Sequence, residues 1–386
     1  MFNRIIEKKF LNTLKKIQFG NLTVIMPNQQ FYEFQGSQAG PRAKLIIYRL
    51  SSIISLYSKG DVGFAEAYQA HHIDSPDLVS LIKFLILNNK HLSHYYFGSR
   101  IVSCLINYLY HLNINTLKGS KKNIEAHYDL GNEFYELWLD SSMTYSSALY
   151  NNEKLSLIDA QMKKYDKMID SINTFSPRIL EIGCGWGGFS RRLIERVECE
   201  YKGITLSEQQ LNYAIKKSKN LINYRLEDYR EQLGSYDYIV SIEMFEAVGE
   251  QYWSTYFKKI KELLKPNGCA LIQTITINNE EFEQYRKGTD FIRSYIFPGG
   301  LLPSENIFSQ KAFEAGLQVK QMHRFGQDYA LTLSEWLKNF DSSDEKIKLL
   351  GYSKQFIRLW RLYLASCVAS FSTGKTNVIQ TILTHA

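Results

Sequence analysis

The residues with the clearest potential for chemistry are glycines near the middle of the chain. Gly183, Gly185 and Gly187 follow the apolar run 178–182 and precede a helical pattern. Glycine lets a strand turn sharply into a helix, and it lets the backbone come within contact distance of a ligand. The sequence therefore predicts a nucleotide-containing ligand across the ends of neighbouring strands.

The spacing around these glycines disfavours NAD. Dinucleotide fingerprints run Gly-x-Gly-x-x-Gly, with an acid about 20 residues further on for the ribose. Here the third glycine comes one residue early, and Glu181 precedes the first. The next strand ends in Thr205, with no carboxylate at its tip until Glu208. An oxidoreductase stays a distant alternative, which tight NADH binding would support.

Longer blocks around the glycines resemble a known family. Residues 181–188 read Glu-Ile-Gly-Cys-Gly-Trp-Gly-Gly, and residues 203–210 read Gly-Ile-Thr-Leu-Ser-Glu-Gln-Gln. Together they resemble the S-adenosylmethionine site of the cyclopropane fatty acid synthase and mycolic acid cyclopropane synthase family. The resemblance covers nearly the whole chain, through further blocks at 63–68, 75–78, 127–132, 143–147, 243–249, 296–300 and 325–329.

The resemblance implies a set of residues around S-adenosylmethionine. The methionine end would be surrounded by hydroxyls and backbone amides, which suit a carboxylate; an amide suits the ribose diol, and an aromatic ring suits the adenine. In that order the residues are Tyr145, Ser146, Gly183 and Thr205, then Gln209, then Asp228 and Tyr229, with Glu181, Gly185 and Gly187 completing the turn. Without the family pattern, Asp228 and Tyr229 would be ordinary residues of a loop after a strand.

The activity of the resembled family is methyl transfer to an alkene carbon of an acyl chain. The resulting carbocation then loses a proton. Such a site must admit an acyl chain, stabilise positive charge and hold a base. Aromatic faces stabilise a cation by about 0.5 to 2 kcal/mol each, and the family pattern assigns this role to Tyr128.

The predicted base is a bound bicarbonate ion. In the resembled family a Cys, a Glu, a His, a main-chain amide and a Tyr hold it, and the matching positions here are Ser147, Glu246, Gln273, Ile275 and Tyr329. Two of the five side chains are therefore exchanged. A serine hydroxyl and a glutamine amide still form hydrogen bonds, so we expect the anion to bind. Glu246 follows the fourth strand, at the sheet edge where open α/β folds place ligands.

Two questions stay open at this stage. Cys367 falls where the family has an active-site cysteine, but a lone cysteine on an apolar helix face is usually a core residue. Proton loss directly from the delivered methyl group closes a cyclopropane ring, whereas prior hydride migration leaves a methylene branch. The residues by themselves do not distinguish the two products. Of the two, we expect the cyclopropane.

These residues need a sheet to position them. Apolar runs alternate with amphipathic helices after residue 116, which predicts a mostly parallel sheet covered on both faces. We expect an α/β fold: a Rossmann-like seven-stranded class I methyltransferase sheet in a catalytic domain at 116–386. The expected strands are 178–182, 201–206, 223–226, 236–242, 269–275, 317–325 and 378–383.

The first 115 residues form a smaller, mostly helical domain in our interpretation. We expect helices over 43–58, 64–70 and 78–88, with short strand-like pieces at 22–26 and 31–34. Its resemblance to the extra domain of bacterial members that act on phospholipids implies lipid recognition, and a homodimer formed through this module.

Charge is concentrated at the N-terminal end of the 386-residue chain. Residues 1–122 hold 15 Lys and Arg against 6 Asp and Glu, whereas the remainder has a net charge of −2. A basic surface attracts anions. Because apolar residues recur at helical spacing within 1–20, we expect a phospholipid surface rather than nucleic acid as the partner. A helix docked on its own domain has the same pattern.

Composition limits the compartment and the cofactors. No apolar stretch reaches the roughly 20 residues that cross a bilayer, and lysines interrupt the N-terminal apolar residues, unlike a secretory signal. We expect a cytoplasmic protein, peripherally associated with the inner face of the membrane. The five cysteines are isolated, without a Cys-x-x-Cys pair or His cluster, so we predict neither a disulfide framework nor a metal site.

Three functions remain after this reading. The favoured one is a cyclopropane-fatty-acyl-phospholipid synthase-like methyltransferase. A small-amine N-methyltransferase would use the same donor, and a lipid-binding protein without catalysis is suggested by the exchanged Ser147 and Gln273.

Overall fold

The computed structural model describes residues 2–92 and 130–386. These residues fall into two compact units. The first unit holds residues up to 92 together with 284–296 and 340–375, and the second holds 130–283, 297–339 and 376–386. The predicted domain boundary near residue 115 lies outside the described residues and stays a prediction.

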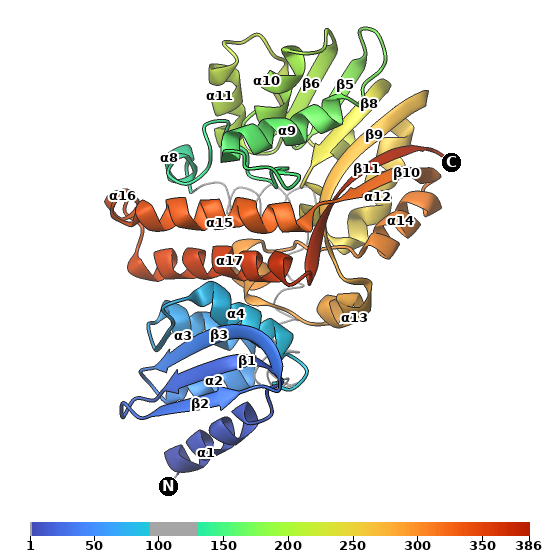
Figure 1. The fold of residues 1–386 in the computed structure, drawn as a ribbon. Helices are drawn as coiled ribbons and strands as arrows, with labels where there is room; N and C mark the ends of the chain where they lie inside the picture. The colour runs from blue at the N-terminus through green and yellow to red at the C-terminus, as the bar shows by residue number, and fades with distance from the viewer. Residues whose placement is uncertain (1, 93–129) are drawn as a thin grey trace. The chain divides into compact units, whose positions relative to one another are not determined.

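The second unit is built on a seven-stranded sheet, which confirms the expected fold class. Its strand order is β10-β11-β9-β8-β5-β6-β7, and Figure 1 shows the sheet from β10 and β11 across to β6. Strand β11 is antiparallel to both neighbours, and the strands from β9 to β7 are parallel. The bounds are β5 (Arg178–Ile182), β6 (Glu200–Thr205), β7 (Tyr224–Leu226), β8 (Tyr236–Ile242), β9 (Leu264–Ile277), β10 (Leu317–Arg324) and β11 (Thr376–His385).

Helices cover this sheet on both faces. One hydrophobic core joins the sheet to α9 (Leu157–Ile169), α10 (Gly188–Ile194) and α11 (Glu208–Lys217). A second layer holds α12 (Trp253–Leu263) and α14 (Glu305–Glu314), whose Phe257 and Phe308 rings lie 5.2 Å apart. Burial on both faces of the sheet explains why consecutive residues of β5 and β8 are buried, without the in-and-out alternation of a one-sided sheet. The unit also holds α8 (Asn132–Glu136) and most of α15 (Gly326–Ser342).

The first unit combines helices with a small sheet. Its strands are β1 (Phe19–Ile25), β2 (Phe31–Gln35), β3 (Gln38–Ile47) and β4 (Ile73–Asp74), in the order β2-β1-β3-β4. Its N-terminal helices are α1 (Phe2–Leu14), α2 (Ser51–Lys59), α3 (Asp61–Gln69) and α4 (Leu78–Leu87). Asp77 caps α4 by accepting a 2.9 Å hydrogen bond from the Ser80 amide. The helices predicted over 64–70 and 78–88 are therefore confirmed.

The helix predicted over 43–58 is wrong in its first part. Residues 43–47 belong to β3, and the helix begins only at Ser51. Ala43, Leu45 and Ile47 are buried while Lys44 is exposed, which is the two-residue period of a strand. A short apolar run is ambiguous between the two periods. Pairing with β1, in which Ala43 lies opposite Leu22, decided for the strand.

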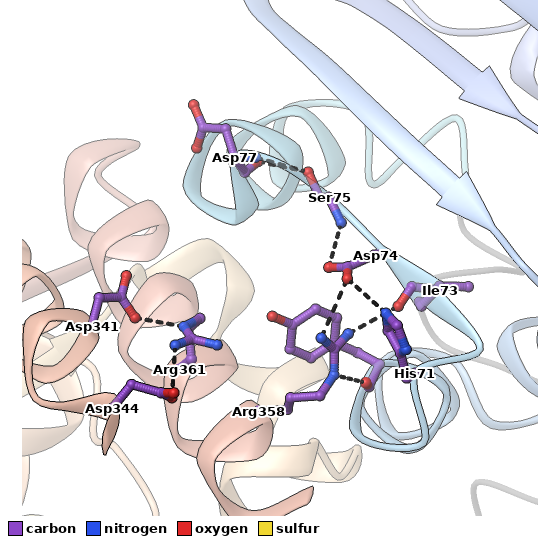
Figure 2. Close-up of polar contacts among 10 residues, drawn as sticks. His71, Ile73, Asp74, Ser75, Asp77, Asp341, Asp344, Arg358 and Arg361 are labelled. Carbon is purple, nitrogen blue, oxygen red and sulfur yellow. Dashed lines mark hydrogen bonds and ion pairs between the residues drawn. The ribbon is translucent and has the colours of Figure 1, made fainter. Parts of the chain in front are cut away.

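The C-terminal part of the chain contributes α16 (Asp344–Leu349) and α17 (Lys354–Ser372) to the first unit. Arg358 of α17 donates hydrogen bonds to the carbonyl oxygens of Tyr68 at 2.6 Å and Ile73 at 3.1 Å. Its guanidinium lies 3.9 Å from the centroid of the Tyr68 ring and 3.3 Å from an Asp74 oxygen (Figure 2). One side chain thus joins α17 to α3 and β4.

Helix α1 uses only part of its apolar face within its own unit. Phe10, Leu14 and the following Ile17 are buried, whereas Ile5 is 61% exposed. Lys9 lies 4.5 Å from the centroid of the Tyr57 ring on α2. The second half of the helix is therefore docked, and its first half presents apolar and basic side chains to solvent. Among the described residues, no helix is both long and apolar enough to cross a bilayer.

The Arg358 contacts predict a stability effect. Replacing Arg358 with Ala should lower the free energy of unfolding by about 2 to 4 kcal/mol, because it removes a stacked cation, its ion pair with Asp74 and its hydrogen bonds to two carbonyl oxygens. Denaturant titration of the full chain measures this change. R358K should recover only part of it, because an ammonium cannot reproduce the planar fork. The exposed Lys354 provides the control, since K354A should change stability by less than about 0.5 kcal/mol. An R358A protein as stable as K354A would contradict the role of Arg358.

Candidate active site

The glycine turn forms the floor of the site. Strand β5 ends at Ile182, and the amides of Gly183 and Cys184 donate hydrogen bonds of 2.9 and 3.0 Å to the Ile204 carbonyl at the end of β6. Gly183 has φ +82° and Gly185 has φ +53°, in the left-handed region that favours glycine. A Cβ on Gly183 would also lie 2.9 Å from Met244 Cγ. The sequence therefore requires glycine here for both conformation and space.

An open pocket lies over this turn. It encloses about 1110 Å³ of empty space, part of it continuous with solvent. Most of the residues predicted for the methyl donor line it, namely Tyr145, Ser146, Glu181, Gly183, Gly185, Thr205, Asp228 and Tyr229. The structure thus brings together residues from the segment before α9 and from the ends of β5, β6 and β7. Their contacts with a ligand stay predictions.

Three predicted residues, Gly187, Gln209 and Cys367, do not line the pocket. Gly187 caps the N-terminus of α10 and does not line the pocket. Gln209 is exposed on α11, and its neighbour Gln210 lines the pocket instead, where it accepts a 2.9 Å hydrogen bond from Thr205 Oγ1. Cys367 lies on α17 in the first unit, where burial raises the pKa of its thiol to about 12. Tyr128 lies outside the described residues.

A buried lysine supports the methionine end of the predicted donor site. Lys164 on α9 has no exposed surface, and its Nζ donates a 2.7 Å hydrogen bond to Ser146 Oγ. Burial lowers the pKa of Lys164 to about 7, although the negative charges of Glu243, Asp140 and Glu181 oppose this shift. Burial likewise raises the pKa of Glu181 to about 7, against a hydrogen bond from the Tyr201 hydroxyl. Lys164 therefore supplies the positive charge beside a group of buried acids.

The predicted adenine end of the site is a short turn in which Asp228 is bound by Arg230. Asp228 accepts hydrogen bonds from the Arg230 amide at 2.9 Å and from its guanidinium at 2.6 Å. The same guanidinium lies 5.6 Å from the centroid of the Tyr229 ring. These contacts hold the single turn η1 (Tyr229–Glu231) after β7. The Asp228 carboxylate is thus committed to the loop that presents Tyr229 to the pocket.

Glu243 is the most strongly bound carboxylate of the site. Its Oε1 accepts hydrogen bonds from the Ser147 amide at 2.9 Å and from Gln273 Nε2 at 2.7 Å, and its Oε2 accepts one from the Tyr329 hydroxyl at 2.6 Å. Gln380 Nε2 donates to Gln273 Oε1 at 3.0 Å, which turns the Gln273 amide nitrogen toward Glu243. Burial raises the pKa of Glu243, while these donors and the charge of Lys164 lower it.

Glu246 is the second buried carboxylate of the site. Its Oε1 accepts a hydrogen bond from the Ile275 amide, and its buried Oε2 has no hydrogen-bond partner among the described residues. Burial and the charge of Glu243 raise the pKa of Glu246 to about 8. Between the two acids, Phe245 is fully buried against Trp253, Phe257 and Phe308. This aromatic cluster holds the backbone that carries both carboxylates.

The residues predicted around bicarbonate therefore do gather, but around protein carboxylates. Ser147, Gln273 and Tyr329 donate to Glu243, and of the five predicted residues Ile275 donates to Glu246 instead. The Ser147 hydroxyl points elsewhere, since it donates to the Ala148 carbonyl at 3.0 Å. The space and the hydrogen-bond donors that were predicted to bind a small anion are therefore occupied by the Glu243 carboxylate. In this arrangement the residues do not fit a bicarbonate ion.

Sequence reasoning missed two residues of the site. Glu243 had a weak signal, because an acid directly after the buried strand β8 lies at the carboxyl edge of the sheet. Nothing in the sequence indicated that the backbone of Glu243 would adopt a φ of +51°, since only glycine, Asn and Asp reach that region commonly. Lys164 carried no signal either, because a lysine on an amphipathic helix normally faces water.

Comparison with known proteins decides the family. Residues 115–381 match the mycolic acid cyclopropane synthetase family. The chain belongs to this family. It is 32% identical over 368 residues to the tuberculostearic acid methyltransferase UfaA1 of Mycobacterium tuberculosis, covering 89% of this chain and 83% of that one. It is 34% identical to the cyclopropane-fatty-acyl-phospholipid synthase of Escherichia coli K12, covering 68% of this chain and 67% of that one.

Solved structures agree with this membership. The mycolic acid cyclopropane synthase CmaA1, in a complex with S-adenosylhomocysteine and CTAB, aligns with a TM-score of 0.64 and 30% identity over 68% of this chain and 97% of that chain. The present chain is thus a cyclopropane fatty acid synthase-like methyltransferase that uses S-adenosylmethionine. Its pocket fits that donor, because the open glycine turn leaves room that a Cβ at Gly183 would fill.

The two glycines of the turn predict different effects on donor binding. G183A should weaken S-adenosylhomocysteine binding by at least about tenfold, because the new Cβ meets Met244 as well as an unfavourable φ. A Cβ on Gly185 meets no atom within 4 Å. G185A should therefore weaken the binding free energy only by the strain of its φ, about 1 kcal/mol. Isothermal titration calorimetry compares the two variants. Equal affinities for both would show that the close approach at Gly183 does not matter.

The pKa of Glu246 predicts a pH-dependent stability. A carboxyl whose pKa rises from 4.5 to about 8 on folding stabilises the protein below pH 4.5 and loses this contribution as the pH rises through 8. From pH 6 to pH 9, the wild type should therefore lose about 1 to 3 kcal/mol relative to E246Q, which cannot titrate. Guanidinium unfolding of both proteins across this range measures the difference, in which other titrating groups largely cancel. A difference independent of pH would contradict the raised pKa.

Proposed function

We propose that this methyltransferase acts on the double bond of an unsaturated acyl chain in a phospholipid and forms a cyclopropane ring. The observation that carries the proposal is the half-buried carboxylate of Glu243, held by three donors at the wall of the donor pocket. Methylation of an alkene carbon produces a carbocation, which must lose a proton to a base held nearby. A neutral amine attacks the methyl group with its lone pair, so N-methylation forms no carbocation that must lose a proton from carbon.

S-adenosylmethionine supplies an electrophilic methyl group on a sulfonium sulfur. The protein's own part is to hold that methyl group beside the alkene and to receive the proton. Tyr145 and Trp336 pack at 5.4 Å and Tyr135 and Trp186 at 5.0 Å, so aromatic faces are abundant near the pocket wall. Such faces favour a cation and keep water away from it.

Two features support a phospholipid as the acceptor. The first unit presents Ile5 and the basic side chains of Lys8, Lys15 and Lys16 to solvent near the N-terminus, a combination suited to an anionic headgroup layer. The E. coli relative is named as a synthase acting on fatty-acyl phospholipids. We therefore propose peripheral association with the inner face of the membrane, with no nucleic-acid partner, and a homodimer of the chain.

A second product has support of its own. Relatives named as fatty acid methyltransferases, UfaA1 and a probable enzyme of Pseudomonas putida, match as well as the named cyclopropane synthase does. A methylene-branched acyl chain would arise from the same carbocation by hydride migration and loss of a proton from the delivered methyl group. Loss of a proton from a chain carbon would instead leave a methylated, still unsaturated chain. The bicarbonate ion that the sequence predicted as the base is not needed for either product if a protein carboxylate receives the proton, and Ser147, Gln273 and Tyr329 donate to such a carboxylate.

Incubation with methyl-labelled S-adenosylmethionine and vesicles of unsaturated phospholipid tests the function. We expect label in the acyl chains, with upfield ring-proton signals in the NMR spectrum of the extracted lipid. Vesicles of fully saturated phospholipid are the control and should take up no label. Vinylic methylene signals without ring protons would identify the second product. Label only in an added small amine, or none at all, would overturn the proposal.

A further inference from the structure

We propose that the carboxylate of Glu243 is itself the base of the reaction. It occupies the place that the sequence assigns to a bicarbonate ion, among the Ser147 amide, the Gln273 side-chain amide and the Tyr329 hydroxyl, which we call the cradle. This inference rests on the proposed function, because it names the group that receives the proton from the methylated acyl chain. It makes the enzyme independent of bicarbonate.

The hydrogen bonds of the cradle are the first support. Ser147 N and Gln273 Nε2 both point at Glu243 Oε1, and the Tyr329 hydroxyl points at Oε2. The two N–H groups can only donate, and the tyrosine hydroxyl can donate as well, so the three groups can all bind a carboxylate. A bicarbonate in reach of the same donors would lie against Glu243, and two like charges in a buried site repel strongly.

The position of Glu243 is the second support. It lines the donor pocket next to Met244 and together with Ser146 and Gly183, whereas Glu246 does not line this pocket. Its backbone is held at φ +51°, in the left-handed region that non-glycine residues seldom adopt. The Glu243 amide donates a 2.8 Å hydrogen bond to the Gln273 carbonyl, so the same residue holds the backbone and the side chain of Glu243.

The neighbouring charges divide the roles of the two acids. Lys164 and three donors favour the ionised form of Glu243, whereas the charge of Glu243 opposes the ionised form of Glu246, although the Ile275 amide and the Thr274 side chain favour it. Burial raises the pKa of Glu246 to about 8, so this carboxyl keeps its proton at neutral pH. Burial raises the pKa of Glu243 as well, but its three donors make it the better placed of the two acids to carry a negative charge, and it is the one that borders the pocket.

The proton transfer balances without a further reactant. The π electrons of the alkene form a bond to the methyl carbon, the carbon–sulfur bond breaks, and its electrons stay on sulfur. The neighbouring alkene carbon becomes a cation. Glu243 takes a proton from the delivered methyl group, and the electrons of that C–H bond close the three-membered ring. The neutral Glu243 carboxyl then returns its proton to solvent when the product leaves.

Two substitutions separate a built-in base from a bound one. E243G suits the left-handed backbone and leaves the three donors facing an empty cradle. E243Q keeps the cradle filled with an amide that cannot accept a proton. E314Q, which changes an exposed acid of α14 paired with Lys311, is the matched control. Rates are measured with unsaturated phospholipid vesicles under nitrogen, in carbonate-depleted buffer, with and without sodium bicarbonate or formate.

We expect the wild type and E314Q to change by less than about twofold on adding either anion. Both Glu243 variants should lose at least about 100-fold in rate, the usual contribution of a general base. Bicarbonate or formate should restore E243G by at least about tenfold and should leave E243Q inactive. Calorimetry should show S-adenosylhomocysteine affinity within about threefold of wild type for E243Q, because the amide preserves the volume of the side chain.

Several results would overturn the inference. These are a wild type that loses most of its rate without bicarbonate and regains it on addition, an E243G protein that is active without an added anion, and an inactive E243G protein that neither anion restores. Loss of S-adenosylhomocysteine binding in both variants would instead assign Glu243 to the donor site. If the wild type methylates another acceptor, the proposed function fails, and the same rate ratios on that acceptor still test Glu243.

Discussion

Burying two carboxyl groups three residues apart is the constraint on which the site depends. Glu243 and Glu246 lie on one short segment after β8, and each must find donors or keep a proton. The donors come from distant parts of the sequence: Ser147 before α9, Gln273 and Ile275 on β9, and Tyr329 on α15. A misfit in any of these elements would leave a buried charge uncompensated, so the chemistry and the packing of the sheet are inseparable.

The same constraint gives a physical meaning to the two exchanged side chains. Ser147 contributes its backbone amide to the cradle, and its hydroxyl is turned to the Ala148 carbonyl. Gln273 contributes an amide whose orientation Gln380 sets from β11. Neither group needs to change its protonation state beside a carboxylate. A cradle of neutral donors around a protein-borne anion is consistent with both exchanges, whereas either exchange taken alone suggested a loss of function.

The two compact units are interleaved along the chain. Residues 284–296 and 340–375 belong with the N-terminal unit, and Arg358 binds α17 to α3 and β4 through Tyr68, Ile73 and Asp74. The sheet of the second unit is completed only by β11, at the end of the chain. Neither unit is therefore a single continuous segment. A lipid-recognition module, if the first unit is one, folds together with residues far beyond position 115.

The amino-acid sequence alone determined the family, the glycine turn and six of the seven strands of the sheet within two residues, because these features depend on local patterns of glycine and apolar residues. It misplaced the start of β9, which begins at Leu264, and the strand at 43–47, where pairing with β1 outweighs helical spacing. It also missed Glu243 and Lys164. Only the tertiary structure shows which donors surround a carboxylate, since side chains from β9, α9 and α15 meet there. Which residue carries a buried charge, and which donors surround it, is decided only when the elements of the fold come together.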